Sequence, residues 1–391
     1  MKFENIAVAG VGQLRFDMYN DVPQVELARD AGLLAMRDAG VNLGDIDEVF
    51  VGYLGLQHQV GVKAVKEFGL TGLPVTHIEN ASATGLFAFR EAAWAVSSGR
   101  AEIAMALCFD KMTEMTAARV SGGNQSRGAG RDQLDASILP AAFFALWAQR
   151  RMHEYGTKPE TFAKIAAKNW NHGALNPLSH RQPDHIVTAE EILASRMIAE
   201  PLTAMMSCPA DDGAAAVIVA SEEWVRAHQP GRRIVRPLSS AAQSEAYSPG
   251  HAFLGPVVGP ATMTQTTAQE AYDKAGVGPA DVSLAMCHDA FANEELEYYE
   301  LLGFCEPGEG DKLVDAGETS LGGRIPFNTD GGLIARGHPG GPTGAAMVHE
   351  IVQQLRREVR PDRQVENARI GLAHCVGGGS VCTVNLFEGV D

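Results

Sequence analysis

The chain lacks a long apolar run, although 45% of its 391 residues are hydrophobic. No stretch approaches the ~18 apolar residues that a membrane-spanning helix needs, so we expect no membrane span. Met1–Asn5 lead directly into the apolar segment Ile6–Gly12, without the basic start, longer apolar run and cleavage site of a secretory leader. We therefore expect a cytoplasmic protein with a core large enough for two or three domains.

Basic residues are also in short supply. The 32 Lys and Arg residues face 48 Asp and Glu residues, which gives a formal charge of −16 and argues against binding to nucleic acid or to an anionic membrane. Residues 119–200 differ, since they hold ten basic and eight acidic residues. An anionic small ligand could bind to this segment, and Arg127 and Arg131 are candidates by position for contacting it.

Paired cysteines are missing as well. The six cysteines are scattered, and no two of them form a Cys-x-x-Cys pair. A disulfide framework is a poor interpretation for a chain of this length, and a structural zinc site would need clustered Cys and His ligands. We expect most of these thiols to be buried small hydrophobes, and we expect no metal site.

An internal repeat organises the chain. Three patterns recur in the same order: a helix end with Gly followed by a strand, a Thr-Gly pair that opens a helix, and a strand that ends on cysteine. They occur at 35–46 and 271–282, at Thr84-Gly85 and Thr343-Gly344, and at 101–108 and 368–375. The repeat predicts a duplicated α/β unit, with two βα layers whose parallel sheets are buried between helices.

One segment has no counterpart in the second half. It contains a tract rich in Gly, Ser and Arg and then amphipathic stretches such as 138–155, which predict a mostly helical insert. The first half resumes with the buried strand 212–219. The predicted domains are an N-terminal half at 1–115 and 201–235, an insert at 116–200 and a C-terminal half at 236–391.

Ser82 lies in Asn80-Ala-Ser-Ala-Thr-Gly85, between a predicted strand (75–79) and a predicted helix (86–98). A hydroxyl on a tight strand-to-helix turn is exposed as a nucleophile, with backbone N–H groups nearby for an oxyanion. The alternative is that Ser82 only caps the helix.

Three more strand ends or turns carry candidate groups. His288 closes a strand and is either a structural histidine or part of a site. His338 lies in a segment with six glycines in the 14 residues 331–344, as a base or an oxyanion donor, where glycines let backbone bend or approach a ligand. Cys375 precedes three glycines and can transfer a proton or merely pack. Gly10-Val-Gly12 lacks the third glycine of a dinucleotide fingerprint, so we assign it no cofactor.

Four motifs together resemble the thiolase superfamily. They are His338-Pro339 in its Gly-rich frame, His288-Asp-Ala-Phe291, Cys375-x-Gly-Gly-Gly and Cys208-Pro-Ala-Asp-Asp-Gly. The His-Asp-Ala-Phe version is similar to the sterol-carrier-protein-2, or lipid-transfer-protein-like, type. The resemblance runs from Ile6 to Phe387. It implies duplicated βαβαβαββ halves in a five-layered αβαβα fold with an inserted loop domain.

The resemblance also implies roles. Residue 82 would be the acyl-accepting nucleophile, His338 would activate it, His288 would support an oxyanion hole and Cys375 would move the proton at the substrate α-carbon. Backbone N–H groups of Ser82 and Gly377 would form a second oxyanion hole. The expected activity is C-acyl transfer, which cleaves a 3-oxoacyl-CoA with CoA or runs the reverse Claisen condensation.

The family has cysteine where this chain has Ser82, and an alcohol is much harder to deprotonate than a thiol of pKa about 8.5. Three explanations stay open. The serine is an engineered replacement; or it belongs to a retro-aldol lyase acting on a 3-hydroxyacyl-CoA, although such aldolases are expected to have tyrosines at the two histidine positions; or the chain is a non-catalytic acyl-CoA binder.

The resemblance sets the expected ligands and partners too. Coenzyme A is expected as a substrate and no cofactor is expected to be bound permanently. A homodimer is expected, and a small OB-fold, zinc-ribbon protein is a possible second subunit.

Overall fold

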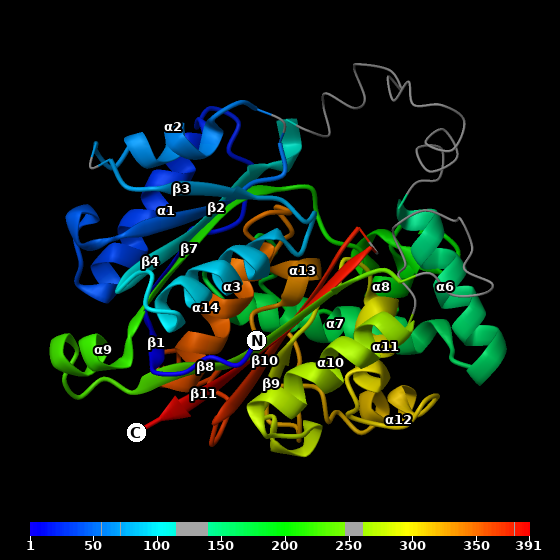
Figure 1. Cartoon of the computed structure of the whole chain (residues 1–391). Coiled ribbons are helices and arrows are strands. Elements are labelled where there is room, and N and C mark those ends of the chain that lie inside the picture. The colour runs from blue at the N-terminus through cyan, green and yellow to red at the C-terminus, as the bar shows by residue number, and fades with distance from the viewer. Residues whose placement is uncertain (56, 71, 115–139, 247–260, 379) are drawn as a thin grey trace.

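The computed structural model describes the chain except residue 56, residue 71, residues 115–139, residues 247–260 and residue 379 (Figure 1). Arg127 and Arg131 therefore lie outside the described residues. Within the described part, no helix is long and apolar enough to cross a membrane.

The first half builds a five-stranded sheet with the strand order β1-β7-β4-β2-β3. Its buried strands are nearly continuous apolar runs, as expected for a sheet covered on both faces. Its elements are β1 (Ile6–Gln13), α1 (Gln24–Ala39), β2 (Glu48–Gly52), α2 (Val60–Lys66), β3 (Val75–Ile78), α3 (Thr84–Ser97), β4 (Ile103–Lys111) and β7 (Asp212–Ser221), followed by α9 (Glu222–His228).

The second half repeats this plan with the strand order β8-β11-β10-β9. The place that corresponds to β3 holds a single bridge, in which Phe327 pairs parallel to Ala285 of β9. The elements are β8 (Ile234–Ser244), α10 (Ala261–Ala275), β9 (Leu284–Met286), α11 (Ala292–Leu301), α12 (Gly310–Asp315), α13 (Gly332–Ala335), α14 (Thr343–Arg356), β10 (Ile370–Gly377) and β11 (Val381–Val390).

The elements stack in five layers, as predicted (Figure 1). Helix α1 packs on the outer face of the first sheet, against β1 and β7, and α10 packs on the outer face of the second sheet, against β8 and β11. Helices α3 and α14 contact each other and lie between the two sheets. The αβαβα arrangement with duplicated halves is confirmed.

The prediction of parallel sheets is wrong, because both sheets are mixed. Strand β2 runs parallel to β3 and β4, but β7 runs antiparallel to its neighbours β1 and β4. In the second half, β10 and β11 are only three residues apart in the sequence and pair antiparallel. A parallel pair needs a long crossover, which the alternating helices provide only for the earlier strands. The alternation of strands and helices in the sequence therefore does not predict the direction of the last strand of each half.

Glycines explain the close approach of α1 to its sheet. A Cβ atom on Gly10 would lie 2.4 Å from the carbonyl oxygen of Ala35, and one on Gly12 would lie 2.4 Å from that of Ala31. The Gly10-Val-Gly12 segment therefore serves helix–sheet packing. The two predicted helix ends are confirmed, since Gly40 and Gly276 have φ values of 73° and 71°.

The described part of the insert is mostly helical and packs against the second half. Arg151 of α6 is buried and donates to Glu300 of α11 at 2.6 Å. Its elements are α6 (Pro140–Tyr155), α7 (Pro159–Leu175), α8 (Ala189–Ala194) and β5 (Met197–Ala199), which pairs with β6 (Leu202–Thr203) just after the insert. The domain boundaries at 115, 200 and 235 stay a prediction.

Candidate active site

The contact between the N-termini of α3 and α14 determines where the site lies. A Cβ atom on Gly85 would come within 2.6 Å of the amide nitrogen of Ala345, and one on Gly344 within 2.3 Å of that of Leu86. The Thr-Gly pair of each repeat thus lets the two helix starts meet backbone to backbone. Residues 80–83, the Ser82 turn, therefore lie beside residues 337–341, the His338 turn.

The Ser82 turn is tight and presents the hydroxyl to His338. Ala81 has φ = 48°, and the Thr84 hydroxyl accepts a hydrogen bond from the Asn80 N–H at 2.8 Å. Ser82 Oγ lies 3.0 Å from His338 Nε2. The alternative that Ser82 caps the helix is wrong, since the N-cap residue is Ala83 and no side chain caps α3.

His338 is oriented from its other ring nitrogen. Nδ1 lies 2.7 Å from the Thr343 hydroxyl, which can accept from Nδ1–H and so leave Nε2 to accept from Ser82. Burial holds the His338 pKa well below its usual value, and His288 and Arg336 add to this. The imidazole is therefore neutral at neutral pH and has the form that a general base requires.

His288 lies next to His338. The two rings meet edge to face, with centroids 5.2 Å apart. His288 Nδ1 lies 2.9 Å from a carboxylate oxygen of Glu294, while no residue of the described part bonds to the buried Nε2. The carboxylate accepts from Nδ1–H and so orients the ring, and Nε2 is the ring atom left for a substrate.

Glu294 is a further residue of the site that the sequence did not predict. Its second oxygen accepts from the Phe291 N–H at 3.1 Å, so the same carboxylate caps α11 and orients His288. The spacing between Phe291 and Glu294 at the start of a helix is a capping-box pattern, and it could have identified Glu294 as the orienting group.

Cys375 completes the group from the end of β10. Its thiol donates to the carbonyl oxygen of Ser82 across 3.2 Å. Burial raises the thiol pKa well above its usual value, and the charges of Cys382 and Glu294 act in the same direction. The sulfur is therefore protonated at rest and is a source of a proton rather than a nucleophile.

Gly377, two residues later, borders the Ser82 turn. A Cβ atom at this position would lie 2.0 Å from the carbonyl oxygen of Asn80. Only glycine fits against this carbonyl. The structure thus brings together all five predicted site residues, Ser82, His288, His338, Cys375 and Gly377, whereas the oxyanion role of the Ser82 and Gly377 N–H groups stays a prediction.

The glycines around His338 lie against carboxylates of the protein itself. Cβ atoms on Gly332, Gly337 and Gly341 would lie 2.4, 1.8 and 2.5 Å from oxygens of Asp289, Asp211 and Asp110, respectively. The sequence left open whether these glycines serve a sharp bend or an external ligand. In this structure they admit internal carboxylates.

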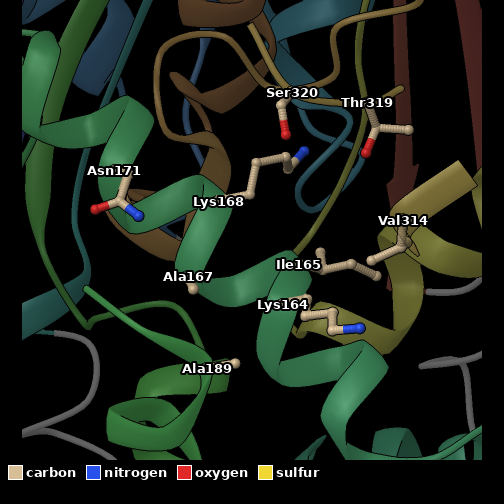
Figure 2. Close-up of a pocket in the computed structure, with 9 residues that line it drawn as sticks. All are labelled: Lys164, Ile165, Ala167, Lys168, Asn171, Ala189, Val314, Thr319 and Ser320. Atoms are coloured by element: carbon tan, nitrogen blue, oxygen red, sulfur yellow. The ribbon is translucent and has the colours of Figure 1, made fainter. Parts of the chain in front are cut away.

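The cavity shown in Figure 2 lies elsewhere. It has a volume of about 290 Å³ and lies between α7, α8, the end of α12 and the loop at Thr319 and Ser320. None of the five site residues lines it, and its buried Lys168 is ion-paired with Glu295. We assign it no ligand. Among the described residues, no group of three or more His, Cys, Asp or Glu side chains is placed to hold a metal ion.

Two family models match the chain. "Thiolase, N-terminal domain" matches residues 10–223 and "Thiolase C-terminal domain-like" matches residues 257–386. The first alone spans more than half of the chain.

Curated relatives and solved structures agree with these matches. The chain is 34% identical to "Sterol carrier protein 2" of Rattus norvegicus (99% of this chain, 72% of the relative). It is 35% identical to "Acetyl-CoA acetyltransferase" of Methanothermobacter thermautotrophicus (98% and 99%) and 32% identical to "Benzoylsuccinyl-CoA thiolase subunit BbsB" of Thauera aromatica (97% and 96%). The solved structure "Ltp2-ChsH2(DUF35) aldolase" has a TM-score of 0.83 at 25% identity, covering 98% of each chain. The chain belongs to the thiolase family and is an acyltransferase of that family.

Proposed function

We propose that this protein cleaves a 3-oxoacyl-CoA with coenzyme A, or runs the reverse condensation, through an acyl group held on Ser82. The observation that carries the proposal is the 3.0 Å contact between Ser82 Oγ and His338 Nε2, with the Cys375 thiol 3.2 Å from the Ser82 carbonyl oxygen. Nucleophile, base and proton donor are thus within reach of one substrate.

The proposed cleavage has two stages. Ser82 Oγ attacks the 3-oxo carbon while His338 Nε2 takes the hydroxyl proton, and the bond between C2 and C3 then breaks. The electron pair stays on C2 as an enolate, which the Cys375 thiol protonates, and acetyl-CoA or a substituted acyl-CoA leaves, while the shortened acyl group stays on Ser82. In the second stage the coenzyme A sulfur attacks the acyl ester and gives its proton to the Cys375 thiolate, while His338 returns its proton to Ser82.

Oxygens that become negative in these steps need donors. We assign His288 Nε2 as a donor to the thioester oxygen of the enolate, together with His338. Because His288 Nδ1–H bonds to Glu294, donation from Nε2 requires the ring form that carries both protons. The backbone N–H groups of Ser82 and Gly377 are the donors we assign to the oxygen of the attacked carbonyl. Fixed donors of this kind stabilise the transition state because they need no reorganisation during the reaction. No bound metal ion is required by this scheme.

The serine limits the rate of this chemistry. An alcohol is a far weaker acid than a thiol, and the lowered pKa of His338 makes it a weak base. We therefore expect slow acyl transfer from Ser82 and fast transfer from a cysteine at the same place. Ser82→Cys differs from the parent by one atom type, so it tests the nucleophile with little change in packing.

The test is a thiolysis assay with acetoacetyl-CoA and longer 3-oxoacyl-CoA substrates on the parent chain and on Ser82→Cys, with Ser82→Ala as the control. A gain of several orders of magnitude in Ser82→Cys, and no turnover in Ser82→Ala, supports the proposal. If neither the parent nor Ser82→Cys cleaves any of these substrates, the proposal fails.

A second candidate is a retro-aldol lyase acting on a 3-hydroxyacyl-CoA. The aldolase among the structural neighbours favours it, whereas the two histidines at positions 288 and 338 argue for thiolysis. A lyase would release an aldehyde or ketone without consuming coenzyme A, and Ser82→Ala would stay active. A protein that binds acyl-CoA with neither reaction would be the non-catalytic carrier.

We also propose a homodimer, and a second subunit as a further possibility. Strand β3 is an edge of the five-stranded sheet, with partly exposed side chains, and can pair with a strand of a second chain. The structural neighbour carries two names, Ltp2 and ChsH2(DUF35), which supports a heteromeric partner such as the small OB-fold, zinc-ribbon protein. The mass of the purified protein in solution, alone and after co-purification from its natural host, tests both.

A further inference from the structure

The His338 turn is held at two points by carboxylates from the first half of the chain. Asp211 Oδ1 accepts the His338 backbone N–H at 2.9 Å, and Asp110 Oδ2 accepts the Gly341 backbone N–H at 2.5 Å. Both aspartates are fully buried. The ring nitrogens of His338 bond to Ser82 and Thr343 instead, so both carboxylates act on the backbone that carries the ring.

Each aspartate is itself rigidly placed. Asp110 lies near the end of β4, and its other oxygen accepts the Leu54 N–H at 3.1 Å, just after β2. Asp211 directly precedes β7, an inner strand that pairs with β1 and β4. The first sheet therefore extends two fixed acceptors toward a turn of the second half.

The turn is shaped to receive them. Gly337 has φ = 117°, and a Cβ atom there would lie 1.8 Å from Asp211 Oδ2; a Cβ atom on Gly341 would lie 2.5 Å from Asp110 Oδ2. Any larger residue at either position would displace the carboxylate or the backbone. The glycines and the aspartates are thus complementary parts of one contact.

We propose that Asp110 and Asp211 are positioning residues that set the distance between His338 and Ser82. The proposal rests on the proposed function, because it concerns the same nucleophile and base. Ser82 belongs to the first half and His338 to the second, and 256 residues of sequence separate them. Main-chain hydrogen bonds at residues 338 and 341 fix the turn on both sides of the ring, and a misplacement of about 1 Å can cost a reaction on the order of a hundredfold.

A chemical readout tests this without any substrate. In the Ser82→Cys background, the thiol at position 82 should be activated by His338, so its alkylation by iodoacetamide should show a low midpoint in a pH titration. The extent of alkylation is followed by mass spectrometry of the peptide that contains residue 82. This keeps it separate from the six natural cysteines.

The variants are then compared in this background. Asp211→Ala removes the acceptor for His338 N–H, and we expect the midpoint to rise by about one pH unit or more and alkylation at pH 7 to slow about tenfold. Asp211→Asn retains an acceptor oxygen and should restore most of the parent behaviour. Asp110→Asn keeps one acceptor for two N–H groups and should shift the midpoint in the same direction by less.

Asp212→Ala is the matched control. Asp212 is the adjacent buried carboxylate, but it accepts from Thr113 and from the Tyr19 N–H rather than from the His338 turn. The Asp212→Ala variant should have a lower melting temperature and an unchanged pH midpoint for alkylation at position 82. If Asp211→Ala and Asp110→Asn both keep the parent midpoint, or if Asp212→Ala shifts it equally, the positioning role is refuted. A chain that fails to cleave 3-oxoacyl-CoA but shows the expected shifts would refute only the proposed function.

Discussion

The two halves of this protein use the same turn in opposite ways. In each half a residue stands two positions before the Thr-Gly pair that opens the central helix, Ser82 in the first and Gly341 in the second. In each half another stands two positions after the cysteine of the repeated strand, Asp110 in the first and Gly377 in the second. The Asp110 carboxylate accepts a hydrogen bond from the Gly341 N–H of the second half. Gly377, at the equivalent position beside the Ser82 turn, has no side chain that could do the same.

This difference shows how a duplicated fold can carry a single site. One copy of the turn receives a carboxylate from the protein and becomes part of the scaffold. At the Ser82 turn, no side chain of the described residues accepts a hydrogen bond from the Ser82 or Gly377 N–H group, and we expect a substrate oxygen to take the place that the Asp110 carboxylate takes at the Gly341 turn.

The halves differ in buried charge as well. In the first half the buried carboxylates Asp110 and Asp211 bond to backbone N–H groups. The second half instead buries ion pairs, such as Asp330 with Arg336 at 2.6 Å and Glu350 with Arg363 at 2.6 Å. A buried pair that loses one member leaves an uncompensated charge and costs on the order of 3–5 kcal/mol. The second half is therefore less tolerant of substitution near the site.

The largest expected effect is that of replacing the nucleophile in the Ser82 turn. Ser82→Cys should raise the rate of 3-oxoacyl-CoA thiolysis by about 10²–10⁴-fold or more, because a thiol gives up its proton to His338 far more readily than an alcohol. Steady-state kinetics of thioester release, with Ser82→Ala measured alongside, check this. Equal rates for serine and cysteine would contradict a nucleophilic role at position 82.

The second prediction concerns a side chain added at Gly377, beside the Ser82 turn. Gly377→Ala puts a Cβ atom 2.0 Å from the Asn80 carbonyl oxygen, so the turn must shift and its N–H groups must lose their alignment. In the Ser82→Cys background we expect kcat to fall on the order of 10²-fold with a smaller change in KM. Gly378→Ala, which replaces a glycine of positive φ, is the comparison that separates backbone strain from loss of the turn's alignment. Full activity in Gly377→Ala would show that this N–H is not used.

The third prediction concerns the orientation of His288. Glu294→Gln keeps one acceptor oxygen for two N–H groups, those of the His288 ring and the Phe291 backbone, and removes the charge, whereas Glu294→Ala removes both contacts. We expect kcat to fall about tenfold in Glu294→Gln and on the order of a hundredfold in Glu294→Ala, since second contacts of a histidine set its tautomer. The circular-dichroism melting curve is the control for loss of the helix cap. Equal kcat in the two variants and the parent would remove Glu294 from the mechanism.

The smallest expected effect is a change with pH in the stability that Asp110, the acceptor at the Gly341 turn, contributes to the folded state. Burial raises the pKa of Asp110 to about 7, whereas an unfolded aspartate titrates near ~3.9. Between these values the folded state holds a proton that the unfolded state has released, so this group's contribution to stability falls as pH rises. Asp110→Asn does not titrate, and its melting temperature relative to the parent should rise by a few degrees from pH 5 to pH 8. A difference that stays constant with pH would contradict the raised pKa.

Much of the fold could be predicted from the sequence, because its patterns are local or repeated. The strands at Val49, Ile103 and Ile370 and the glycine helix ends at positions 40 and 276 lie where periodicity and composition place them. The direction of β7 and β11 could not be predicted, since strand pairing depends on how a connection runs in space.

The candidate site divides in the same way. Ser82, His288, His338 and Cys375 each lie at a strand end or a glycine-rich turn, which is visible in the chain by itself. Asp110, Asp211 and Glu294 were not predicted as site residues, although Asp211 lies in the motif Cys208-Pro-Ala-Asp-Asp-Gly. An acidic residue at a strand end or near a helix start looks like any other until its partner N–H or imidazole is known.

The sequence by itself determined the duplication, the layered α/β plan and the identity of the reactive side chains, because these follow from repeats and from residue chemistry. Only the tertiary structure decided which of them meet. The contact of α3 with α14 at Gly85 and Gly344 brings Ser82 within 3.0 Å of His338, and buried carboxylates of one half bind the backbone of the other. Such contacts join residues far apart in the chain, so their distances depend on how the folded elements pack and bond to one another.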